Sequence, residues 1–137
     1  MAHGIHIHVQ CPQCHQSLMT PAPKIDHLDS IQLLVKIQNK IGHLYLSQIY
    51  GSYAKIFENV DDLADVVVEC SCPHCYRPFP VHQACGSCGA AVIGLSLAVG
   101  GTIKVCSRNG CQHHSLEFED SQDALNLFRS QDNSGLF

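Results

Sequence analysis

The chain has 137 residues, of which 45% are hydrophobic and 15% are charged, and its formal net charge is −4. A disordered chain of this length would be more charged and less aliphatic, so we expect one compact globular domain over residues 1–137. Twelve acidic residues outnumber eight Lys and Arg residues and no basic stripe is present, so we expect no nucleic-acid partner. No small-molecule substrate is evident from the sequence.

The sequence also predicts a cytoplasmic protein with no membrane partner. Residues 1–8 have no basic region and no long apolar run, so they do not form a secretory signal. The most apolar stretch, residues 90–99, is too short to span a bilayer and contains Gly94 and Ser96. Because the cytosol keeps thiols reduced, the nine cysteines indicate metal binding and not disulfides.

The first predicted strand covers residues 4–10. Apolar and polar residues alternate there, which places Ile5, Ile7 and Val9 on one face. The segment Thr-Pro-Ala-Pro at residues 20–23 predicts an irregular connection, because proline cannot continue the ladder of a central strand.

Three further strands are predicted in the N-terminal half. Residues 30–38 and 40–47 form a hairpin with a tight turn near Asn39, and another turn follows at residues 50–53. The run of three valines within residues 63–69 predicts a well-buried strand, because β-branched residues favour strands.

The C-terminal half predicts a hairpin and a helix. A Gly-Gly dipeptide separates the apolar segments 91–99 and 102–106, and both glycines can adopt the positive φ of a tight turn. Residues 116–118 form a short final strand. A helix then begins at residue 120 or 121 and ends near residue 129. Its apolar stripe comprises Ala124, Leu125 and Phe128.

The predicted fold class is therefore mostly β (small α+β), with zinc-ribbon-type antiparallel hairpins and one C-terminal helix. Three local sub-units are expected, over residues 1–69, 70–90 and 91–130. No exact internal repeat is present, although a strand followed by a cysteine pair occurs at both Cys11 and Cys72.

Eight of the nine cysteines form four close pairs. These are Cys11 with Cys14, Cys72 with Cys75, Cys85 with Cys88, and Cys106 with Cys111. A C-x-x-C turn lets two thiolates bind one ion, and two such turns complete a tetrahedron around Zn²⁺. The sequence therefore predicts two tetracysteine sites with two zinc ions per chain. Cys70 is left over, and we expect a packed free thiol.

The spacing favours one arrangement of the four pairs. The central pairs, Cys72 with Cys75 and Cys85 with Cys88, are close in sequence and are predicted to form site 1. The outer pairs, Cys11 with Cys14 and Cys106 with Cys111, then form site 2. Cross-bracing of the first pair with the third and of the second with the fourth is the alternative. Because four residues separate the cysteines of the last pair, His113 or His114 is a candidate substitute for Cys111.

The segments Cys-Pro-His-Cys at residues 72–75 and Cys-Gly-Ser-Cys-Gly at residues 85–89 resemble the knuckles of zinc-ribbon and rubredoxin-like proteins. The resemblance is close over residues 70–90 and looser at the outer pairs. It implies a fold element and its metal site, and it implies no activity.

Iron is the alternative to zinc, because similar knuckles hold iron in rubredoxin-type sites. The cysteines here have neither the aromatic nor the strongly acidic surroundings typical of such carriers, which favours zinc. His6 and His8 share one strand face with His3 nearby; we expect a solvated polar face there, with a metal site as the alternative.

We expect no enzyme, since a closed tetracysteine site cannot activate water and no phosphate loop, nucleophile elbow or H-E-x-x-H motif is present. The sequence favours a protein-binding module or accessory subunit of a larger assembly. A redox protein and a nucleic-acid-binding zinc ribbon are the alternatives. The expected recognition surfaces are a sheet edge near residues 30–50, with Tyr45, Tyr50 and Tyr53, and the terminal helix.

Overall fold

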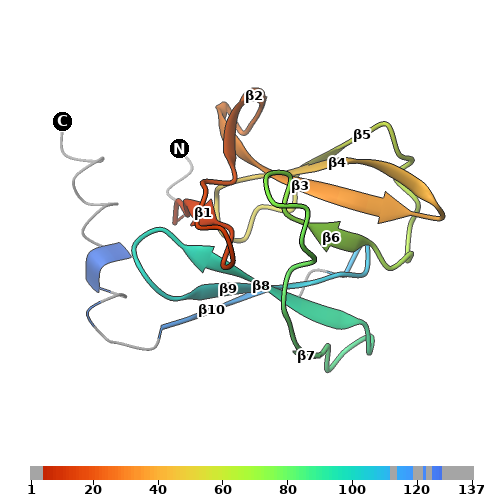
Figure 1. Cartoon of the computed structure of the whole chain (residues 1–137). Helices are drawn as coiled ribbons and strands as arrows, with labels where there is room; N and C mark the ends of the chain where they lie inside the picture. Colours follow the sequence, from red (N-terminus) through yellow and green to blue (C-terminus); the bar gives the residue numbers. More distant parts are fainter. Residues whose placement is uncertain (1–4, 112–113, 119–121, 123–124, 128–137) are drawn as a thin grey trace.

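The structure, a computed structural model, describes residues 5–111, 114–118, 122 and 125–127. Two antiparallel sheets face each other (Figure 1), and a short helical segment follows them. The predicted fold class is confirmed. Within the described residues, no helix has the length and apolar character that a membrane span requires.

Over the part of the chain that the structure describes, each sheet has five strands. Sheet 1 contains, in spatial order, β2 (Met19–Ile25), β3 (Leu28–Ile37), β4 (Lys40–Leu46) and β5 (Lys55–Glu58), and β6 (Glu69–Ser71) also pairs with β3. Sheet 2 contains β1 (Val9–Gln10), β8 (Ala91–Leu97), β9 (Thr102–Cys106) and β10 (His114–Glu117), and β7 (Val81–Ala84) also pairs with β8. One apolar core lies between the sheets and includes side chains of both.

The central hairpin of sheet 1 follows its sequence pattern closely. Alternate residues of β3 are buried, and the two turn residues, Gln38 and Asn39, have φ angles of 49° and 69°. Positive φ at both turn positions matches the twist of the flanking strands. The predicted hairpin is therefore confirmed.

The β8–β9 hairpin is also confirmed. Gly100 and Gly101 have φ angles of 107° and 96°. A Cβ atom at Gly101 would lie 2.6 Å from the carbonyl oxygen of Glu117, so the turn excludes a side chain there by space as well as by conformation.

The N-terminal segment connects the two sheets. Ile7 and Val9 are buried as the alternation predicts, although β1 itself is only two residues long. His6 forms a bridge with Ile49 after β4 of sheet 1, whereas Val9 pairs with Leu97 in β8 of sheet 2.

The strand predicted at residues 63–69 is wrong. Val67 is 43% exposed, and regular pairing begins only at Glu69 in β6. The backbone of this segment bonds instead to the loop after β9: the Val68 amide donates to the Ser107 carbonyl at 2.8 Å, and the Asn109 amide donates to the Val66 carbonyl at 2.8 Å. Tertiary contacts thus override the strand propensity of the valines.

The irregular connection predicted at residues 20–23 is part of β2 instead. This strand lies at the edge of sheet 1, and its register shifts between Thr20 and Ile25. An edge strand needs ladder bonds on one side only, so it accommodates both prolines.

The helix stripe is placed differently from the prediction. Leu127 is 3% exposed, whereas Leu125 is 49% exposed. Which face of such a short helix is buried depends on its contacts with the rest of the fold. The local sequence pattern does not decide it. The predicted stripe residues Ala124 and Phe128 lie outside the described residues.

The predicted sheet edge near residues 30–50 is wrong as well. Strands β3 and β4 have neighbours on both sides, so neither is an edge. Tyr45 is only 5% exposed, while Tyr50 is half-buried and Tyr53 is exposed. The strands β5 and β7 were not predicted from the sequence, because each is four residues long and shows no clear apolar alternation.

Candidate metal centres

Three of the cysteine pairs lie in the same type of turn, which we call a knuckle. In each, the amide of the residue after the second cysteine donates to the carbonyl of the first: His15 to Cys11, Tyr76 to Cys72 and Gly89 to Cys85, at 2.9, 2.9 and 2.8 Å. These three donor residues have φ angles of 63°, 63° and 79°. Glycine adopts a positive φ without strain, which suits Gly89, and His15 and Tyr76 adopt it without being glycine.

Backbone amides in the knuckles point at sulfur. The Gln13 amide lies 3.3 Å from Cys11 Sγ, and the His74 amide lies 3.3 Å from Cys72 Sγ. The amides of Cys88 and Ser87 lower the pKa of Cys85 in the same way. Such hydrogen bonds stabilise thiolates, which are the form that binds a metal.

The first and second knuckles together form the N-terminal centre, made of Cys11, Cys14, Cys72 and Cys75. The Cys11 and Cys75 sulfurs are 3.8 Å apart, and those of Cys14 and Cys72 are 3.7 Å apart. A tetrahedron with metal–sulfur bonds of about 2.3 Å has edges of about 3.8 Å. The four sulfurs therefore fit one tetrahedral ion.

The third and fourth pairs form the C-terminal centre, made of Cys85, Cys88, Cys106 and Cys111. The Cys85 and Cys111 sulfurs are 3.8 Å apart, and those of Cys88 and Cys106 are 3.4 Å apart. Cys111 thus supplies the fourth sulfur despite its wider spacing. Of the candidate substitutes, His113 lies outside the described residues, and the backbone of His114 pairs with Val105 in β10.

The predicted pairing is therefore wrong, and so is the cross-braced alternative. The central pairs are close in sequence, but β7 lies between them and pairs with β8, which carries the third knuckle away from the second. Contacts join the first knuckle to the second instead. Gln13 Nε2 donates to the Pro78 carbonyl at 3.1 Å, and His74 Nε2 lies 3.0 Å from the Ser17 carbonyl.

These two contacts are equivalent. In each, the side chain just before the second cysteine of one knuckle contacts the carbonyl of the third residue after the second cysteine of the other knuckle. The first two knuckles are therefore related by a local twofold symmetry. The recurrence of a strand before Cys11 and before Cys72 was the sequence signal for this pairing.

Burial disfavours the thiolate form of two ligands in the absence of a metal ion. Burial raises the pKa of Cys72 to about 12 in the N-terminal centre and that of Cys106 to about 12 in the C-terminal centre. A divalent ion would supply the opposite charge, so metal binding at these centres would release protons and contribute to folding.

Arg108 is a functional residue that sequence analysis missed. The Ala90 amide is the main cause that lowers the pKa of Cys88 to about 6, and the nearby Arg108 guanidinium lowers it further. The same contact with Cys88 raises the pKa of Arg108. Arg108 Nη1 also donates to the Asp65 carbonyl at 2.8 Å, which fixes the guanidinium beside the C-terminal centre.

The remaining candidates do not form a third centre. Among the described residues, only the two tetracysteine groups bring three or more metal-binding side chains together. His8 Nε2 lies 3.2 Å from Gln48 Oε1, and His3 is outside the described residues. Cys70 is a free thiol packed against the core, as expected, and burial raises its pKa to about 12.

No family model, no curated protein and no solved structure matches the chain. The two tetracysteine groups are consistent with zinc-ribbon-like sites. The donor set of four thiolates in each group suits zinc or iron.

The pairing predicts which cysteine variants keep a metal ion. Replacing Cys85, Cys88, Cys106 and Cys111 by Ser should leave the N-terminal centre complete, so one ion per chain should remain. The matched control replaces Cys72, Cys75, Cys85 and Cys88 by Ser. It leaves two cysteines in each centre and should bind no ion tightly. Elemental analysis after gel filtration measures both variants, and the reverse result would restore the pairing that we have rejected.

The two centres should also lose metal at different rates. Cys11 and Cys72 belong to the main core, whereas Cys85 and Cys106 share a separate small cluster with Ala90 and Val92. Access of a chelator needs local opening, which costs less where few apolar side chains are buried. We expect the C-terminal centre to release its ion roughly tenfold faster, a difference of about 1.4 kcal/mol.

Alkylation during treatment with a chelator, followed by mass spectrometry of peptides, identifies the cysteines that open first. Modification of Cys85 and Cys88 should precede that of Cys11 and Cys72. Equal rates of alkylation at the two centres would contradict the inference that the centre with the smaller apolar cluster opens more easily.

Proposed function

We propose that this protein is a non-catalytic double zinc-ribbon scaffold that acts as a protein-binding module or accessory subunit of a larger assembly. One observation carries the proposal: each centre brings four sulfurs within 4.8 Å of one another, with two sulfur pairs in each at 3.4–3.8 Å. A site closed by four protein ligands has no position for water or substrate, so its ion acts in folding and not in catalysis.

Zinc suits this role better than iron. Its preferred tetrahedral geometry is that of a structural site, and it has no redox chemistry to disturb the fold. The acidic balance of the chain favours a protein partner over a nucleic acid.

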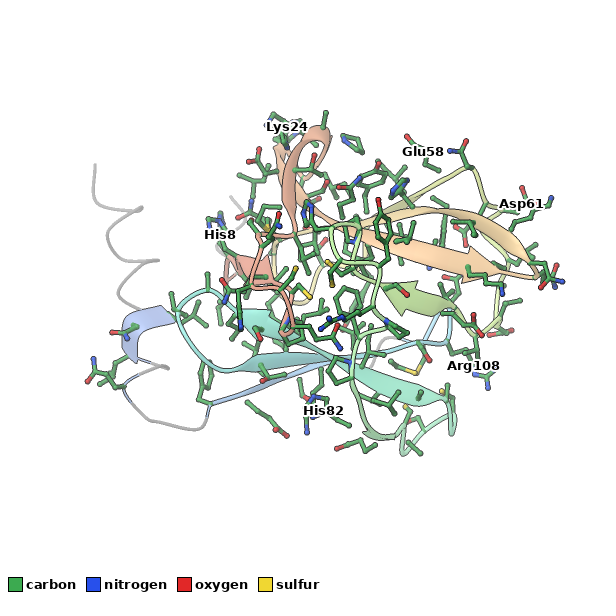
Figure 2. The ribbon with its side chains drawn as sticks, in the orientation of Figure 1. His8, Lys24, Glu58, Asp61, His82 and Arg108 are labelled. Carbon is green, nitrogen blue, oxygen red and sulfur yellow. The ribbon has the colours of Figure 1, made fainter. Side chains whose placement is uncertain are left out.

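The outer face of sheet 1 is the recognition surface that we propose, in place of a sheet edge. Residues directly opposite each other in a ladder share a face, so Ile56 lies beside Tyr45, and Ile41 lies beside Lys36. Figure 2 shows Glu58, a neighbour of Ile56, on the side of sheet 1 that is turned away from sheet 2. Ile41 is 65% exposed and Ile56 is 39% exposed, and exposed apolar side chains on one face are typical of protein-binding sites.

Metal content tests the scaffold role. Protein purified without an affinity tag or added metal should contain two zinc ions per chain and show no visible colour, because the two centres are complete and Zn²⁺ has no visible absorption. Elemental analysis and a visible spectrum provide the measurement. Iron with visible absorbance would overturn the scaffold role and indicate an electron carrier.

The recognition surface is tested with variants that change exposed side chains only. In native extract the untagged protein should elute from a size-exclusion column in an assembly larger than the 15.0 kDa chain. Ile41→Glu combined with Ile56→Glu should shift it to monomer size, because two buried charges are costly at an apolar interface.

The control for this experiment is Val81→Glu, an equally exposed apolar position in sheet 2. It should leave the assembly intact. Unchanged metal content and thermal unfolding would show that the variants fold. Elution of all the wild-type protein at monomer size would count against a partner.

A further inference from the structure

A cavity of about 120 Å³ lies between the two sheets, beside β5 and the loop after β9. Its walls are mainly apolar and come from both sheets. Sheet 1 contributes Leu33, Leu44 and Phe57, and sheet 2 contributes Leu95, Ile103 and Val105. An apolar cavity of about 150 Å³ holds benzene, so this smaller space suits a short alkyl chain or a group no larger than one ring.

The lining offers two cations although the chain is acidic. Among the described residues, the lining includes Lys55 and Arg108 and no carboxylate, and Cys106 and Cys111 of the C-terminal centre lie at its Arg108 end. Arg108 already donates to the Asp65 carbonyl and lies beside Cys88, so its guanidinium serves the C-terminal centre. Lys55 is therefore the cation that remains for a ligand.

Lys55 has neutral neighbours at the cavity. It shares the inner face of β5 with Phe57, and its Nζ lies 5.9 Å from the centre of that ring. It also donates to the Asn109 side-chain oxygen. The Asn109 amide nitrogen contacts Asp62 Oδ1 at 2.6 Å, so Asp62 is on the far side of this amide and does not line the cavity. No acidic side chain of the lining neutralises the Lys55 ammonium.

Ser107 provides an independent sign of a ligand. This residue lines the cavity and is 7% exposed, yet its Oγ is buried without a hydrogen-bond partner in the described part of the chain. A buried hydroxyl without a partner costs about 1–3 kcal/mol. Ser107 is two residues from Asn109, which Lys55 contacts, so the hydroxyl and the ammonium belong to the same region of the lining.

We propose that this cavity binds a small monocarboxylate with an apolar body no larger than one ring or a short alkyl chain. The carboxylate accepts hydrogen bonds from Lys55 Nζ and Ser107 Oγ, and the apolar body packs against Phe57, Leu44 and Ile103. This binding site adjoins the C-terminal centre, since Cys106 and Cys111 also line the cavity, but the carboxylate is held by Lys55 and Ser107 and by no metal ligand. It does not depend on the proposed recognition surface, which lies on the opposite face of sheet 1.

The test titrates the full-length, metal-loaded protein with hexanoate and with benzoate by calorimetry. Hexanamide and benzamide are the matched neutral probes, since they keep the shape and lose the charge. We expect saturable binding of at least one acid in the millimolar range or tighter, and at least about tenfold weaker binding of its amide.

Two variants locate the carboxylate. Lys55→Gln should weaken binding of the acid by about tenfold or more and leave that of the amide unchanged, and Ser107→Ala should weaken binding of the acid several-fold. Lys40→Gln, at the exposed start of β4, is the control and should bind like the wild type. Metal content checks that each variant folds.

The proposal fails if neither acid binds saturably to the wild type, in which case Lys55 serves only as an inward charge that protects an edge strand. It also fails if acid and amide bind equally, or if Lys55→Gln folds and binds the acid as the wild type does. If Lys55→Gln does not fold, the proposal is tested by the affinities of the acid and its amide for the wild type and for Ser107→Ala. Equal affinities of acid and amide for the wild type, or an unchanged affinity of the acid for Ser107→Ala, would then overturn it.

Discussion

The N-terminal centre is the interaction on which the rest of the structure depends, because it joins the two sheets. Cys11 follows β1 of sheet 2, and Cys72 follows β6 of sheet 1. Both cysteines are fully buried and belong to the core between the sheets. A chain of this length buries a limited apolar core, so an ion bound by these four sulfurs would add a cross-link where the core alone would be marginal.

The C-terminal centre supports this arrangement through backbone contacts. Its loop bonds to residues 65–68 by three amide–carbonyl hydrogen bonds of 2.8–3.0 Å, and these residues lead directly into β6 and Cys72. Arg108 belongs to the same loop and contacts both Cys88 and the Asp65 carbonyl. The two centres are thus connected by a short, hydrogen-bonded segment, although they share no ligand.

Because both centres are closed, the surfaces available for function are the faces and the interior of the two sheets. The outer face of sheet 1 has exposed isoleucines beside charged neighbours, which suits a protein partner. The space between the sheets is apolar with one available ammonium, which suits a small acid. These two sites use opposite faces of β5, since Ile56 points outward and Lys55 points inward.

The sequence by itself determined the features that depend on neighbouring residues: the four cysteine pairs, the Gln38–Asn39 turn, the Gly100–Gly101 turn and the mostly β fold. A spacing of two residues, or four in the last pair, is short enough to make a chelating pair, and a positive φ is a local requirement. Only the tertiary structure decided which pairs meet, because this depends on β1 and β6 joining different sheets. The same long-range contacts leave Val67 exposed, select Leu127 as the buried helix residue and bring Lys55 to Asn109 across the chain. Such contacts join residues tens of positions apart, and no local pattern encodes them.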